Sequence, residues 1–74
     1  MLYMNGADPL YLQLYNQLRF DIENGKLGKG QRLLSERRLA AEYGISRMTA
    51  RMALQLLADQ GFVTIEPQKG ALVL

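Results

Sequence analysis

Apolar residues recur at every fourth position in the first third of the chain. The members of this stripe are Leu10, Leu14, Leu18 and Ile22. Such spacing places the side chains on one face of a helix. Asp8-Pro9 suits the start of that helix, because aspartate can cap free amides and proline is tolerated at the first helical position. Asn24-Gly25 suits its end, so the pattern predicts a helix over residues 9–24.

The segment from Ser35 to Gly61 predicts two short helices separated by a turn at Gly44. Ser35 and Ser46 are placed to cap these helices, and Ile45 is expected to seal the core beneath the turn. Small residues are expected where the two helices cross, at Ala40, Ala41, Ala50 and Ala53. On a helical wheel at ~100° per residue, the second helix has an apolar face formed by Ala50, Ala53, Leu54 and Leu57. Its other side, with Met48, Arg51 and Gln55, is free to contact a partner.

The C-terminal segments 62–65 and 71–74 are rich in β-forming residues and flank a Pro-Gln-Lys-Gly turn, which predicts a hairpin. Residues 32–34 are a candidate for one further, very short strand. Helix, turn, helix and hairpin follow one another in the order of a winged helix. The expected fold class is therefore mainly α with a small β-hairpin, a winged helix-turn-helix in one domain over residues 1–74.

Composition removes several functional classes. The chain has no cysteine and no histidine, so a zinc finger is untenable and we expect no metal site. It has no phosphate-binding glycine loop and no catalytic constellation, which argues against an enzyme, and we expect no cofactor. No apolar run approaches ~18 residues and no export signal opens the chain, so we expect a cytoplasmic protein without a membrane partner.

The net charge of +2 is a weak sign of nucleic-acid binding, but its distribution is informative. Five arginines and only two glutamates lie between Arg32 and Arg51. Arg47 and Arg51 are the main candidates for base and phosphate contacts, because a guanidinium can grip guanine or phosphate with two hydrogen bonds. Neither has an acid one turn later, so no ion pair within the helix engages them. The alternative is a solvated arginine paired with Glu42 or another acid.

Other candidates surround these arginines. Ser46 and Thr49 can donate to phosphates from the first turn of the helix. Lys69-Gly70, at the hairpin tip, can approach the DNA backbone, although an ordinary turn with an exposed lysine explains this pair almost as well. Met48 is a further candidate contact. Together with Met52 it also supports a competing reading, in which the domain docks another protein through an adaptable apolar surface.

The motifs resemble the DNA-binding domain of the GntR family of bacterial transcription regulators, over nearly the whole chain. The opening Pro9-Leu10-Tyr11 is similar to the HutC and YtrA branches. The remaining matches are Ile22 to Leu27, Leu34 to Ala40, Gly44 to Leu54 and Gly61 to Val73.

This resemblance implies DNA contacts by Arg37, Ser46, Arg47, Thr49 and Arg51. It also implies a homodimer on a near-palindromic operator, a role most often as a repressor, and a C-terminal effector-binding domain that this chain lacks. The chain is thus expected to be a fragment of a longer regulator. The family's wing tip usually has two glycines after basic residues, whereas this chain has Gln68-Lys69-Gly70 after Glu66-Pro67. We therefore predict a weak contribution from the wing, with Glu66 repelling phosphates if it points toward them.

Overall fold

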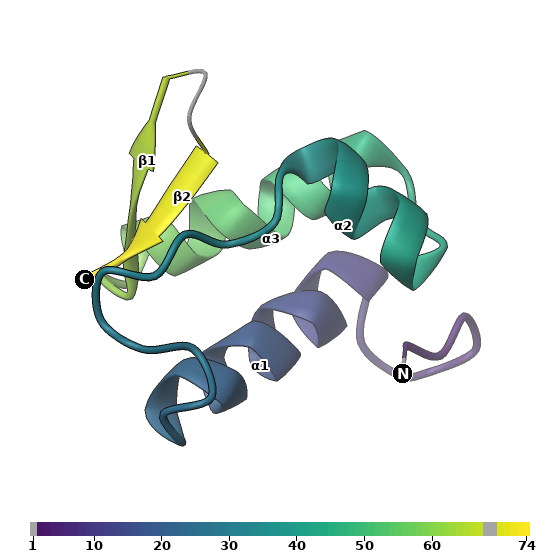
Figure 1. The fold of residues 1–74 in the computed structure, drawn as a ribbon. Coiled ribbons are helices and arrows are strands. Elements are labelled where there is room, and N and C mark those ends of the chain that lie inside the picture. Colours follow the sequence, from purple (N-terminus) through teal and green to yellow (C-terminus); the bar gives the residue numbers. More distant parts are fainter. Residues whose placement is uncertain (1, 68–69) are drawn as a thin grey trace.

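The computed structural model describes residues 2–67 and 70–74 of the chain. In this part, three helices are followed by a hairpin (Figure 1). The elements are α1 (Leu10–Glu23), α2 (Glu36–Tyr43), α3 (Arg47–Asp59), β1 (Val63–Glu66) and β2 (Gly70–Val73). The predicted winged helix-turn-helix architecture is confirmed.

Helix α1 begins one residue later than predicted, and the expected cap by Asp8 is wrong. Pro9 itself occupies the N-cap position and no side chain caps the helix, so Asp8 lies one residue too early to reach the free amides. Gln13 instead folds back from the first turn, and its Nε2 donates to the carbonyl oxygens of Asp8 and Tyr3, each at 2.8 Å. The segment before α1 is held by this side chain.

The apolar stripe of α1 packs against α3, which lies above it in Figure 1. Leu14 and Leu18 are buried, and Leu10 and Ile22 at the two ends of the stripe are half-buried. From α3, the four residues predicted to face the core are all buried: Ala50, Ala53, Leu54 and Leu57. The core therefore occupies one side of α3 and leaves its other side exposed.

The turn between α2 and α3 depends on Gly44, which adopts a left-handed conformation with φ 67°. Its amide and that of Ile45 both donate to the carbonyl oxygen of Ala40 and close the end of α2. Residues that carry a Cβ rarely adopt this backbone conformation. The expectation for Ala41 is wrong: Ala40, Ala50 and Ala53 are buried, whereas Ala41 lies on the exposed side of α2.

The hairpin pairs β1 with β2 antiparallel, with Val63 opposite Val73 and Glu66 opposite Gly70. Both strands lie one residue away from the predicted segments. The predicted strand at 32–34 is reduced to a single bridge between Arg32 and Leu72. Backbone hydrogen bonds on either side of this bridge nevertheless tie the loop after α1 to β2, so the hairpin is anchored beside the start of α2.

Within the described part of the chain, no helix is both long and apolar enough to cross a membrane.

Candidate nucleic-acid interface

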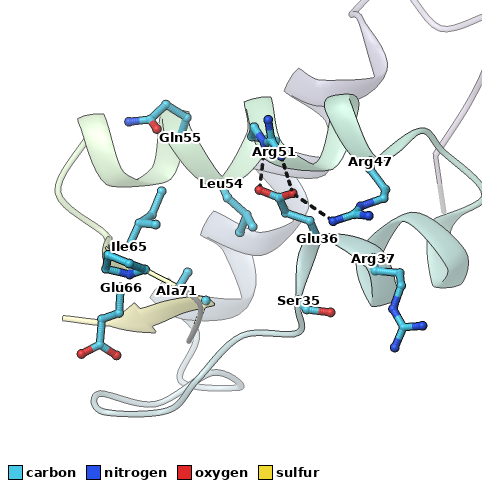
Figure 2. Close-up of a pocket in the computed structure, with 12 residues that line it drawn as sticks. Ser35, Glu36, Arg37, Arg47, Arg51, Leu54, Gln55, Ile65, Glu66 and Ala71 are labelled. Atoms are coloured by element: carbon cyan, nitrogen blue, oxygen red, sulfur yellow. Dashed lines mark hydrogen bonds and ion pairs between the residues drawn. The ribbon is translucent and has the colours of Figure 1, made fainter.

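A groove of about 810 Å³ lies between the start of α2, the exposed side of α3 and the hairpin (Figure 2). It collects side chains from segments far apart in the sequence. Those that matter most are Glu36, Arg37, Arg47, Arg51, Ile65 and Gly70. Most of the predicted contact residues thus border one open concave surface or the start of the helix beside it.

The start of α3 is organised by Ser46, as the sequence predicts. Its Oγ accepts a hydrogen bond from the amide of Thr49 at 3.0 Å and donates to Thr49 Oγ1 at 2.8 Å. Because Thr49 Oγ1 is the acceptor in this second bond, its own hydroxyl hydrogen remains available to an outside acceptor. Ser46 therefore caps the helix and orients a hydroxyl donor beside the positive helix end.

Arg47 and Arg51 lie one turn apart on the exposed side of α3, with side chains 65% and 58% exposed. No acid on α3 engages them, as predicted, but an acid on another helix does, as the alternative interpretation allowed. Arg51 donates from Nε to Glu36 Oε2 at 3.0 Å and from Nη2 to Glu36 Oε1 at 3.2 Å. Arg47 Nη2 lies 3.9 Å from the same Oε1. Figure 2 shows the carboxylate between the two guanidinium groups.

Glu36 is a residue of the groove that the sequence analysis did not single out. Its carboxylate reaches across from the first turn of α2 to a helix whose own first turn has no acidic residue. The hydrogen bond from Arg51 is the largest influence on its pKa and lowers it from the ordinary 4.5. Burial opposes this shift, and the charges of Arg51 and Arg47 add to it. Glu36 is thus an anion under physiological conditions and balances part of the positive charge at the start of α3.

A signal for Glu36 was present in the sequence. An acid at the first position of α2 favours the positive end of that helix, and the helix-turn-helix crossing brings this position close to the second turn of α3. The family resemblance implies a DNA contact only for the neighbouring Arg37. Glu36 and Arg51 are 15 residues apart and lie on different helices, so rules for spacing within one helix do not predict the pair.

Arg37 and Met48 are both exposed. Arg37 extends away from Glu36 (Figure 2), and no acid in the described ranges lies within ion-pairing distance of it. Met48 is 58% exposed on the first turn of α3, and Met52 is 43% exposed one turn later. Both positions are therefore accessible to a partner.

The described part of the hairpin contributes less charge to the groove than α3. Glu66 points away from Arg51 (Figure 2), and its Oε1 accepts from Arg32 Nη1 at 3.0 Å. The repulsion of phosphates considered for Glu66 is therefore reduced by a neighbouring cation. Gly70 borders the groove with φ 92°, whereas Lys69 lies outside the described residues.

Known proteins share both the sequence and the fold of this chain. The family model "Bacterial regulatory proteins, gntR family" matches residues 10–73. The HTH-type transcriptional repressor NagR of Bacillus subtilis (strain 168) is 46% identical over 55 residues, which cover 74% of this chain and 23% of NagR. The chain therefore spans about a quarter of that relative's length.

Two solved structures have nearly the same fold. YtrA from Sulfolobus acidocaldarius, a GntR-family transcription factor, superposes with a TM-score of 0.92 at 29% identity, over 99% of this chain and 62% of YtrA. The DNA-binding domain of AraR in complex with operator ORX1 gives a TM-score of 0.91 at 26% identity, over 100% of this chain and 95% of that domain. The chain belongs to the gntR family of bacterial regulatory proteins, as a winged helix-turn-helix DNA-binding domain of a transcription regulator.

Proposed function

We propose that this domain binds an operator half-site with the exposed side of α3 in the major groove, and that the regulator to which it belongs is a repressor. The observation that carries this proposal is the pair Arg47 and Arg51, which project from the first two turns of α3 into an open groove. A helix of this kind fits the width of the major groove. The operator-bound AraR domain and the repressor NagR, both similar to this chain, support the assignment.

The residues divide into base-reading and phosphate-binding groups. Arg47 and Arg51 can present two parallel N–H groups to guanine O6 and N7, while Met48 offers an apolar surface to a thymine methyl group. Ser46 and Thr49, at the positive end of α3, suit a phosphate. Arg37 extends from α2 and suits the backbone beside the half-site, and Lys69 and Gly70 would contact the backbone from the wing.

We infer that the whole regulator has parts beyond this domain. We propose that residues 1–74 form one domain of a longer protein, because curated relatives such as NagR are about three times as long. In the family pattern, a C-terminal domain binds a small effector and drives assembly of a homodimer on a near-palindromic operator. Since such a regulator acts on chromosomal DNA, we place the protein in the cytoplasm.

The test is a selection from a random duplex library with the 74-residue chain, followed by affinity measurements on the enriched duplex over a range of salt concentrations. Sequence-specific binding predicts enrichment of a common motif and an affinity that falls steeply with salt, because phosphate contacts release counterions. Absence of any enriched motif, with weak binding to all duplexes, would contradict the proposal. Salt-independent binding to a protein would instead favour the docking role of Met48 and Met52.

We further expect the isolated domain to be monomeric or only weakly dimeric. The stripe on α1 is used by the core, with Leu14 fully buried, so this stripe is not available for a stable interface. A single half-site should therefore bind each domain almost as well as a full palindrome. Sedimentation that showed a tight dimer at micromolar concentration would refute this expectation.

A further inference from the structure

Glu36 contacts Arg51 along one edge of the guanidinium group. The two hydrogen bonds, at 3.0 and 3.2 Å, use Nε and one hydrogen of Nη2. A guanidinium has five N–H donors in a fixed planar fork, so the remaining donors are both hydrogens of Nη1 and the second hydrogen of Nη2. Nη1 and Nη2 together form the end of the fork, which matches the two acceptors of guanine. The ion pair thus leaves the base-reading edge of Arg51 open.

From this geometry we propose that Glu36 is a positioning residue that aims the open edge of Arg51 at a base and makes phosphate a poorer partner. The inference rests on the proposed function of α3. Without a partner, an exposed arginine samples many rotamers and loses that freedom on binding. Two hydrogen bonds to a carboxylate at the start of α2 already restrict the side chain of Arg51 in the free domain. Less conformational entropy is then lost when DNA binds.

The charge of Glu36 discriminates between the two kinds of acceptor. A phosphate that approached Arg51 would also approach the carboxylate, and like charges at close range repel each other. Guanine is neutral and carries no such penalty. One carboxylate therefore disfavours sequence-independent contacts at Arg51 and retains the base contact, which raises the preference for the operator.

Arg47 is held less firmly by the same carboxylate. Its Nη2 lies 3.9 Å from Glu36 Oε1, beyond hydrogen-bonding range, and its side chain is 65% exposed. The effect of Glu36 should therefore act mainly through Arg51. A general effect of the negative charge of Glu36 near the DNA would not depend on Arg51, whereas a positioning effect would. The two can therefore be told apart.

The experiment compares wild type, Glu36→Gln and Glu42→Gln. The control residue Glu42 lies on the same helix and is exposed, so both variants make the same change in net charge. The probes are the duplex of about 20 base pairs enriched from the random library, long enough for two half-sites one helical turn apart, and the unselected duplex pool. Affinities for both probes are measured at several salt concentrations, and each substitution is repeated in an Arg51→Ala background.

Positioning predicts that Glu36→Gln lowers the ratio of selected to unselected affinity by about tenfold or more. It should also steepen the slope of log affinity against log salt concentration on unselected DNA by about 0.9, because Arg51 gains a phosphate contact. Glu42→Gln should leave the ratio within about twofold of wild type. In the Arg51→Ala background the effect of Glu36→Gln should largely disappear. A folding defect caused by Glu36→Gln would instead persist in that background.

Equal ratios for Glu36→Gln and Glu42→Gln would overturn the inference and leave the proposed function intact. A full effect of Glu36→Gln in the absence of Arg51 would do the same, because Glu36 would then act through the fold. A wild-type chain that bound the selected and unselected duplexes equally would overturn the proposed function and the inference with it.

Discussion

The start of α3 and the hairpin border the same groove but have different electrostatic character. The start of α3 presents two arginines with one carboxylate, Glu36, between them. On β1, the carboxylate of Glu66 is paired with Arg32, and the neighbouring Ile65 is 45% exposed. The comparison indicates that α3 can supply directional hydrogen bonds to bases, whereas the described part of the hairpin offers mainly apolar surface and backbone.

The largest expected effect comes from Arg51→Ala. If Arg51 grips a guanine, its loss should weaken binding to the selected duplex by roughly 1–3 kcal/mol, and Arg47→Ala should act in the same direction. The measurement is fluorescence anisotropy at fixed salt, with circular dichroism to verify the fold. Arg19→Ala removes an equal charge from α1 and serves as the matched control. Unchanged affinity in both Arg47→Ala and Arg51→Ala would mean that the arginines of α3 do not read bases, and the proposed difference in role between α3 and the hairpin would be lost.

The second effect concerns the cap of α3. Ser46→Ala removes the acceptor for the amide of Thr49 and should destabilise the domain by about 0.5–2 kcal/mol in urea unfolding. Ser35→Ala removes the corresponding cap on α2, where Ser35 Oγ accepts from the amide of Arg38 at 3.2 Å, and should have a similar effect on stability. Only Ser46→Ala should also weaken DNA binding under conditions where both variants are folded. An equal loss of affinity in both would show that the hydroxyl of Ser46 serves stability alone.

The helix ends and the buried face of α3 could be predicted because they depend on local chemistry. Ser35, Gly44 and Ser46 act within a few residues of their own positions, so their roles follow from capping and turn preferences. The contact between Glu36 and Arg51 could not be found in that way, because it requires the crossing of two helices. The failed cap at Asp8 has another cause: Pro9 occupies the N-cap position itself, so Asp8 lies one residue before the position from which a side chain caps a helix.

The hairpin tip should contribute less than α3. Lys69 is the charged residue at the tip in the sequence, and one phosphate contact changes the logarithmic salt slope by only about 0.9. Lys69→Ala should therefore weaken selected and unselected duplexes modestly and about equally. Lys29→Ala is the control, because the adjacent Gly30 bonds to Val73 at the opposite end of the hairpin. A loss larger than that of Arg47→Ala, or confined to the selected duplex, would mean that the wing reads bases.

The smallest effect concerns the stability of the free domain and its dependence on pH. Because the hydrogen bond from Arg51 lowers the pKa of Glu36 below 4.5 in the folded state, the unfolded chain binds a proton more readily. The contribution of this carboxylate to stability is therefore fully present above its unfolded pKa and is lost as the pH falls through the lower, folded pKa. Its size is small, because Arg51 is well exposed and water screens the pair.

Urea unfolding of wild type and Glu36→Gln between about pH 3 and pH 7 measures this contribution. The difference between the two proteins should be constant in the upper part of that range and should shrink on acidification below 4.5. In an Arg51→Ala background the pH-dependent part should be smaller, because the main cause of the lowered pKa has been removed. A difference that grew on acidification would mean that Glu36 is held chiefly as a neutral acid. The carboxylate would then not be the group that balances the arginines of α3, and the electrostatic contrast with the hairpin would need another origin.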